Sequence, residues 1–163
     1  MRFLFIMNLS EWLVVRMGRK TRDHVANRVI NDDELFSELV QLVHTGSKTQ
    51  RMKGAWVLSG MHLMDSNYLQ SHYPMLLECL KSESVGGVKR ELLRCFEGTT
   101  LREEIREPLI VIAMNWVTDE RQDLAVRYLC YRLLKPLLRH YHELQSELTI
   151  QVDLYQKKFG RFP

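Results

Sequence analysis

A pair of residues, one apolar and one basic, recurs along the chain at nearly constant spacing. The pair stands at Met52-Lys53, Val88-Lys89 and Val126-Arg127, so the spacings are 36 and 38 residues. A proline followed by apolar residues precedes the second and third pairs, at Pro74 and Pro108. A period of about 35–40 residues with two helices per period is typical of an α-solenoid, in which each unit packs only against its neighbours.

Apolar residues at helical spacing cover almost the whole chain. We expect repeat units at about residues 32–65, 68–98 and 101–135, with end helices at about 10–29 and 137–156. Residues 109–112 are β-branched enough for a strand, but the helical period continues on both sides, so we expect a helix. Pro136 is expected to kink or restart the chain. The sequence therefore predicts one all-α domain over residues 1–163, a right-handed α-α superhelix of about three helix pairs with cap helices.

Composition and charge exclude several classes of protein. The chain of 163 residues is 45% apolar and 26% charged, which is ordinary for a globular domain and unlike a disordered chain. No apolar run approaches the length of about 20 residues that a membrane span needs. The net charge of +3 is too small to imply nucleic acid by itself, although the two ends of the chain are basic and its middle is acidic.

The cysteines and the N-terminus predict a cytoplasmic protein. Cys79, Cys95 and Cys130 form no C-x-x-C pair, and an odd number of cysteines on apolar helix faces is typical of reduced thiols. The apolar run before Asn8 is five residues long and no small-residue cleavage site follows it, so we expect no secretory signal. Self-association is a further expectation, because residues 3–6, Phe159 and Phe162 place apolar side chains near the two ends of the chain.

The clearest repeat unit joins residues 73–80 to residues 88–96 through a short polar turn. This unit, Tyr-Pro-Met-Leu-Leu-Glu-Cys-Leu followed by Val-Lys-Arg-Glu-Leu-Leu-Arg-Cys-Phe, resembles a HEAT or armadillo repeat. The resemblance covers about residues 32–135, in three units, and implies a fold more than an activity. A four-helix bundle is the main alternative, but the phased repeat argues against it.

The most metal-like cluster lies at His140 and His142. On a helix these two side chains point about 200° apart, so they cannot share a metal ion as histidines at i and i+4 do. We expect them to be solvated or to cap a helix. No nucleophile elbow, G-x-G-x-x-G sequence or Walker loop is present. The sequence therefore predicts no cofactor, no metal and no enzymatic activity.

Paired carboxylates occur at the start of the helix that is expected from about residue 101. Acidic and basic residues alternate there, namely Arg102, Glu103, Glu104, Arg106 and Glu107. At a helix N-terminus such carboxylates interact favourably with the helix dipole and pair with bases on the next turn. We therefore expect Arg102 and Arg106 to pair with these carboxylates, in preference to general acid–base catalysis.

A HEAT-like DNA-binding or DNA-glycosylase-type protein is the alternative function. Bacterial alkylpurine DNA glycosylases have HEAT-like repeats and combine an aspartate with aromatic residues, for which Asp119 or Asp123 near Trp116 and Arg127 is the nearest counterpart. Trp56 is not expected to stack on a base. It is predicted to be a core residue.

The repeat phase places Trp56 at the same buried position as Leu92 and Cys130. The same phase predicts the residues that face outward from the second helix of each unit. They are Gly54 and Leu58, then Arg90 and Arg94, then Tyr128 and Arg132.

Arginine and tyrosine are enriched at binding hot spots, so Arg90, Arg94, Tyr128 and Arg132 are the candidate binding residues. The alternative is that the arginines pair with acidic residues on a solvated face, namely Glu91, Glu97 or Asp123. We expect a bacterial interaction protein whose concave face binds a protein partner with an acidic segment, in preference to nucleic acid, and no membrane.

Overall fold

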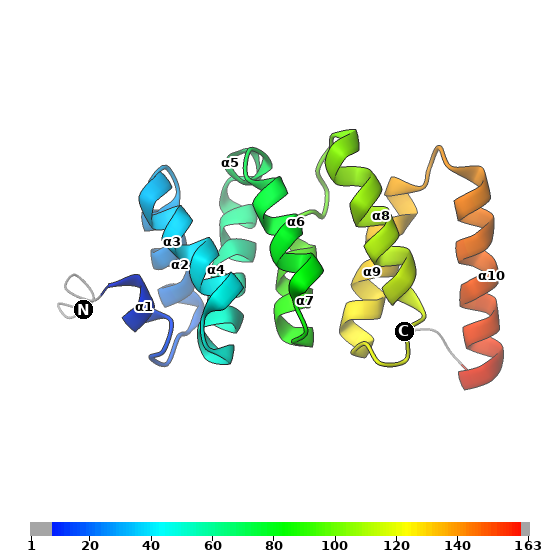
Figure 1. Ribbon diagram of the computed structural model, residues 1–163, viewed down its shortest axis with the longest axis horizontal. Helices are drawn as coiled ribbons and strands as arrows, with labels where there is room; N and C mark the ends of the chain where they lie inside the picture. Colours follow the sequence, from blue (N-terminus) through cyan, green and yellow to red (C-terminus); the bar gives the residue numbers. More distant parts are fainter. Residues whose placement is uncertain (1–7, 161–163) are drawn as a thin grey trace. The chain divides into compact units, whose positions relative to one another are not determined.

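The computed structural model describes residues 8–160, in which helices and turns occur and no strand does (Figure 1). The chain divides into two compact units, residues 1–95 and residues 96–163. The helices of unit 1 are α1 (Leu9–Trp12), α2 (Arg19–Val29), α3 (Asp33–Thr45), α4 (Lys48–Met64), α5 (Ser66–Gln70), α6 (Tyr73–Ser82) and α7 (Gly86–Arg94). Unit 2 contains α8 (Glu103–Val117), α9 (Leu124–Leu137) and α10 (His142–Phe159). This all-α architecture confirms the predicted fold class.

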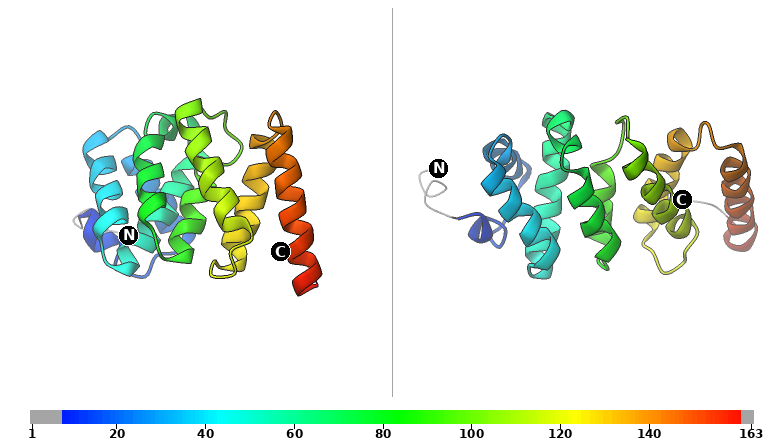
Figure 2. Two further views of the ribbon diagram at one scale, coloured as in Figure 1. Left: turned by 45° about the vertical axis from the view of Figure 1, so that its right-hand side comes forward. Right: turned by 45° about the horizontal axis from the view of Figure 1, so that its top comes forward.

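Unit 1 has two rows of helices. In one row α4 packs between α2 and α7, and in the other row α3 packs against α6. Each row contacts the other through α3 with α4 and through α6 with α7, as the two views of Figure 2 show. The pairs α3–α4 and α6–α7 are therefore two successive helical hairpins, as expected for repeats.

Local sequence signals begin these helices. The side chain of Asp32 accepts a 3.0 Å hydrogen bond from the backbone N–H of Leu35 and caps α3. Ser47 and Gln50 form a reciprocal capping box at the start of α4. These caps satisfy backbone donors that the first helical turn leaves without partners, so the polar turns fix where each helix begins.

In unit 2, α8 packs against α9, and the β-branched residues 109–112 lie inside α8, which confirms the helix predicted there. The break expected at Pro136 is wrong by a few residues. The helix α9 continues through Pro136 and ends one residue later, at Leu137. The turn at residues 138–141 then leads to α10.

The N-terminal cap also differs from the prediction. One helix was expected at about residues 10–29, but α1 ends at Trp12 and α2 begins after Gly18, which occupies its N-cap position. Of the apolar residues expected to favour self-association, Phe159 is exposed. Residues 3–6 and Phe162 lie outside the described residues.

The predicted phase of the first repeat is wrong by two residues. Gly54 and Leu58, expected to face outward, are buried, and Leu58 is 0% exposed like Leu92. Met52, which was aligned with the buried Val88, is 38% exposed. Burial therefore aligns Gly54 with Val88, at a spacing of 34 residues instead of 36.

This shift also changes the position of Trp56. In the corrected phase Trp56 takes the place of Arg90 and Tyr128, so it is only half-buried, and the prediction of a core tryptophan there is wrong. Its ring instead lies under the guanidinium of Arg22, 5.2 Å from the ring centroid. A cationic side chain from α2 therefore packs on the indole, which remains partly exposed.

The physical reason for the error is the glycine at the start of the repeat. A Cβ at Gly54 would lie 2.6 Å from Cγ2 of Val43, so α4 approaches α3 too closely for any larger residue. A pattern that searches for apolar side chains does not register such a position and selects Met52 instead. In the next repeat the equivalent position is Val88, which is buried, and Leu92 is also buried as predicted.

Candidate functional site

The four candidate binding residues lie in two different units. Arg90 and Arg94 belong to α7 of unit 1, and Tyr128 and Arg132 belong to α9 of unit 2. The side chains of Arg94 and Arg132 are 46% and 51% exposed, and Tyr128 is 44% exposed. Each pair therefore faces outward from its own helix, as predicted, and a continuous stripe that includes both pairs stays a prediction.

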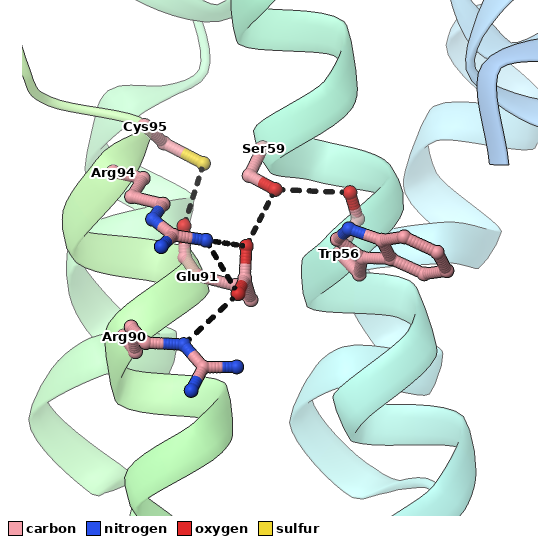
Figure 3. Close-up of polar contacts among 6 residues, drawn as sticks. All are labelled: Trp56, Ser59, Arg90, Glu91, Arg94 and Cys95. Atoms are coloured by element: carbon pink, nitrogen blue, oxygen red, sulfur yellow. Dashed lines mark hydrogen bonds and ion pairs between the residues drawn. The ribbon is translucent and has the colours of Figure 1, made fainter. Parts of the chain in front are cut away.

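The arginines of α7 surround the carboxylate of Glu91, which is 4% exposed (Figure 3). Nη1 of Arg94 donates to both carboxylate oxygens, at 2.9 and 3.1 Å, and Nε of Arg90 donates to Oε1 at 3.1 Å. On the opposite side the hydroxyl of Ser59 in α4 donates to Oε2 at 2.8 Å. A buried carboxylate is stable only when paired and hydrogen-bonded, and these four donor contacts meet that condition.

This cluster has an outer side as well as a buried one. Arg90 and Arg94 together carry two positive charges against the single charge of Glu91, and both side chains remain partly exposed. Contacts with the carboxylate hold the side chains in place, which lowers the entropy that an incoming ligand must remove. The cluster can therefore present N–H donors to an anionic group without first ordering both side chains.

A second fixed arginine lies in unit 2. Nη2 of Arg132 pairs with Oε1 of Glu97 at 3.1 Å, and its guanidinium lies 5.6 Å from the ring centroid of Tyr128. The tyrosine and the arginine are four residues apart on α9 and share one helix face. Arginine pairing with Glu91 and Glu97, which was the alternative interpretation, is thus confirmed. Among the described side chains, none of these arginines forms an ion pair with Asp123.

The residues considered for catalysis occupy ordinary structural positions. His140 and His142 are both exposed, as expected. Hydrogen bonds from Arg121, together with one from Gln122, lower the pKa of Asp119 to about 2. Both oxygens of Asp119 accept bonds from these two residues, so the carboxylate closes the turn between α8 and α9. Neither oxygen is free to hold a substrate.

The acidic start of α8 pairs less than predicted. Arg102 approaches Glu104 at 3.9 Å, which is an exposed ion pair. Arg106 forms no ion pair with a described carboxylate, and its guanidinium instead lies 5.8 Å from the ring centroid of Tyr141. The expectation that Arg106 pairs along its own helix is therefore wrong, because the turn before α10 brings an aromatic ring to it.

Two kinds of feature are absent from the described part of the chain. Residues 8–160 contain no group of three or more His, Cys, Asp or Glu side chains that could hold a metal ion. None of the helices in this range has both the length and the apolar character that a membrane span requires.

Comparison with known proteins identifies the family. No curated protein and no solved structure matches the chain significantly. A HEAT repeat domain family matches residues 9–161, which covers all ten helices of the described range. With the paired helices of unit 1 and the recurring positions of α4, α7 and α9, this match shows that the chain belongs to the HEAT repeat family.

Proposed function

We propose that this HEAT repeat protein is a non-enzymatic interaction protein that binds an acidic segment of a protein partner. The observation that carries the proposal is the exposed pair of Tyr128 and Arg132 on α9, in which Glu97 and the tyrosine ring hold the guanidinium. Arg90 and Arg94 offer the same chemistry on α7. In our proposal these arginines face the concave side of the repeat array.

The chemistry of these side chains favours carboxylates as ligands. A guanidinium has five N–H donors in a planar fork, and one partner carboxylate leaves several of them available. An aspartate or glutamate from a partner can accept hydrogen bonds from the guanidinium N–H groups that remain available. An apolar neighbour in the same segment can pack against the exposed face of Tyr128. Repeat proteins use such rows of side chains to bind extended segments.

Binding to a nucleic-acid backbone is less favoured. Each candidate arginine is already paired with Glu91 or Glu97, so these helices offer little net positive charge, whereas binding to a polyphosphate backbone depends on many cationic side chains. A glycosylase-type reaction has no support from Asp119 either, because its carboxylate oxygens already accept hydrogen bonds from Arg121 and Gln122. All three cysteines are free and buried, which supports a reducing compartment such as the cytoplasm.

The proposal is tested by removing one exposed guanidinium from each unit. The variant Arg94→Gln with Arg132→Gln avoids the fold damage that a glutamate next to Glu91 would cause. Binding of a polyglutamate peptide and of a short DNA duplex is measured for wild type and variant by fluorescence anisotropy at physiological salt. The control, Arg19→Gln with Arg102→Gln, also removes one exposed arginine from each unit.

We expect the variant to bind the peptide at least about tenfold more weakly, because two charge-assisted hydrogen bonds are lost. The control is expected to retain wild-type affinity. Equal losses in both variants would show that only the overall charge matters and would overturn the proposal. Tighter binding of DNA than of peptide by the wild type would instead support the nucleic-acid alternative.

A further inference from the structure

A pocket of unit 2 lies where α9 ends and the chain turns toward α10. Its volume is about 780 Å³. One wall comes from the segment before α8 and from α8 itself, and the other from the end of α9 and the turn at residues 138–141. The charged residues that line it are Glu97, Arg106, Arg132 and Arg139, and the lining also contains His140 and Tyr141.

Positive charge exceeds negative charge in this pocket. Three arginines line it and Glu97 is its only carboxylate, already bonded to Arg132 at 3.1 Å. Neither Arg106 nor Arg139 forms an ion pair with a carboxylate in the described part of the chain. Two arginines without an ion-pair partner among the described side chains therefore line one cavity, and their positive charges favour an anion there.

Arg106 also has a buried hydrogen-bond donor that lacks an acceptor among the described residues. Its Nε is buried and has no hydrogen-bond partner within residues 8–160. The guanidinium lies over the ring of Tyr141, which orients it but accepts no conventional hydrogen bond. A buried donor without an acceptor is costly, so an acceptor from a ligand would gain more here than at an exposed arginine.

We propose that this pocket binds a phosphate monoester carried by a small aromatic or apolar group. A phosphate offers three terminal oxygens, so it can accept hydrogen bonds from more than one of the arginines that line the pocket, and it carries more negative charge than a carboxylate. His140 belongs to the same lining. Leu133 and Pro136 provide an apolar wall for the organic part of the ligand.

This inference goes beyond the proposed function and does not depend on it. All lining residues belong to unit 2, and one of them, Arg132, is also a candidate binding residue of the proposed function. The arginines that carry the inference, Arg106 and Arg139, are not among the four candidate binding residues. Because the two proposals are tested with different variants and different probes, either can fail while the other holds.

The experiment uses the full chain and phenyl phosphate as the probe, with binding measured by isothermal titration calorimetry. We expect saturable binding with one site per chain. Arg139→Gln should weaken it about tenfold, since one charge-assisted contact is lost at an exposed residue whose replacement does not disturb the core. Arg106→Gln should weaken it at least as much, and its thermal unfolding is recorded to separate loss of binding from loss of fold.

The matched control is Arg102→Gln. It removes the same charge from the same unit, at a side chain that is 87% exposed and does not line the pocket. We expect its affinity for phenyl phosphate to stay within about twofold of wild type, because an exposed charge outside the cavity acts only through a screened field. A weakening equal to that of Arg139→Gln would overturn the proposal.

Three further probes test which part of phenyl phosphate the pocket binds. Phenol tests the apolar wall alone, inorganic phosphate tests the anion alone, and benzoate replaces the phosphate by a carboxylate. We expect each of them to bind more weakly than phenyl phosphate. Benzoate binding as tight as phenyl phosphate, or no saturable binding of phenyl phosphate at all, would overturn the proposal.

The source of the phosphate is tested with a short peptide that contains one phosphotyrosine and otherwise glycine. Tighter binding of this peptide than of phenyl phosphate would assign the pocket to phosphorylated protein segments. Weaker binding of the peptide, with phenyl phosphate still bound, would assign it to small phosphorylated molecules. Both results support the shared chemistry, provided that Arg139→Gln lowers the affinity.

Discussion

The hydroxyl of Ser59 in α4 donates a 2.8 Å hydrogen bond to the buried carboxylate of Glu91 in α7. Thirty-two residues separate these two side chains, so the bond connects the second helices of two successive repeats. The same carboxylate fixes Arg90 and Arg94 on its exposed side. One buried anion therefore stabilises the contact between repeats and also orients the arginines that we propose for binding.

Replacement of Ser59 by alanine should lower the free energy of unfolding by about 1–3 kcal/mol, because Glu91 loses a donor in a buried site. Chemical denaturation measures this loss. In a Glu91→Leu background the serine has no charged partner, so the same replacement should cost much less. The control Ser37→Ala, at an exposed position of α3, should change stability by less than about 0.5 kcal/mol. Equal losses in both backgrounds would contradict the coupling.

The corrected phase of the first repeat predicts that Leu58 contributes as much as Leu92. Both are 0% exposed, so Leu58→Ala and Leu92→Ala should each lower stability by about 2–5 kcal/mol through loss of packing and the cavity that remains. Leu63 on the same helix is 73% exposed, and Leu63→Ala should cost less than about 0.5 kcal/mol. Denaturant titration distinguishes the two cases. A small effect of Leu58→Ala would restore the original phase, in which this residue faces solvent.

The contrast between Leu58 and Leu92 shows how far the sequence can predict the fold. Helices were predicted almost everywhere they occur because an apolar stripe with a period near 3.6 survives in each of them. The phase of the second repeat was correct because Val88 and Leu92 carry that stripe. In the first repeat the position equivalent to Val88 is Gly54, which has no side chain for the pattern to detect.

The candidate site was predictable to a similar degree. The exposure of Arg94 and Arg132 follows from helical phase, and the pairing of Arg94 with Glu91 follows from their i, i+3 spacing on α7. Glu97 lies in the segment between α7 and α8, so its pairing with Arg132 depends on the tertiary fold. The pocket in unit 2 was not predicted. Neither Arg106 nor Arg139 stands at a position that the repeat pattern predicts to face outward. The two residues line one pocket because the turn before α10 lies beside α8.

The close approach at Gly54 gives a prediction opposite to ordinary helix propensity. Alanine normally stabilises a helix interior relative to glycine by about 1 kcal/mol. Here its Cβ would lie 2.6 Å from Cγ2 of Val43, so Gly54→Ala should destabilise the protein by about 1–3 kcal/mol. In a Val43→Ala background the obstructing methyl is absent, and the same change should be neutral or stabilising. Thermal unfolding of the four proteins measures the coupling, and a stabilising Gly54→Ala in the native background would refute the contact.

The stacked rings of Phe36 and His72 predict a pH dependence of stability. The ring centroids lie 4.1 Å apart, and burial lowers the pKa of His72 below its ordinary value of 6.5, although the charge of Asp33 acts in the opposite direction. Tyr68 packs against both rings, and burial raises the pKa of its hydroxyl, so it stays neutral in this range. The folded protein therefore favours the uncharged imidazole.

The sign of the effect follows from proton uptake. Above pH 6.5 the imidazole is neutral in both states, and its contribution to stability is fully present. As the pH falls below 6.5 the unfolded chain binds a proton first, so stability decreases until the lower pKa of the folded state is passed. We expect His72→Phe, which keeps an aromatic ring but cannot be protonated, to lose less stability than wild type on acidification from about pH 7 to about pH 5. Urea denaturation at a series of pH values measures the slopes, with His140→Gln as the exposed-histidine control. An identical slope in wild type and His72→Phe would show that the ring stack does not favour the neutral form.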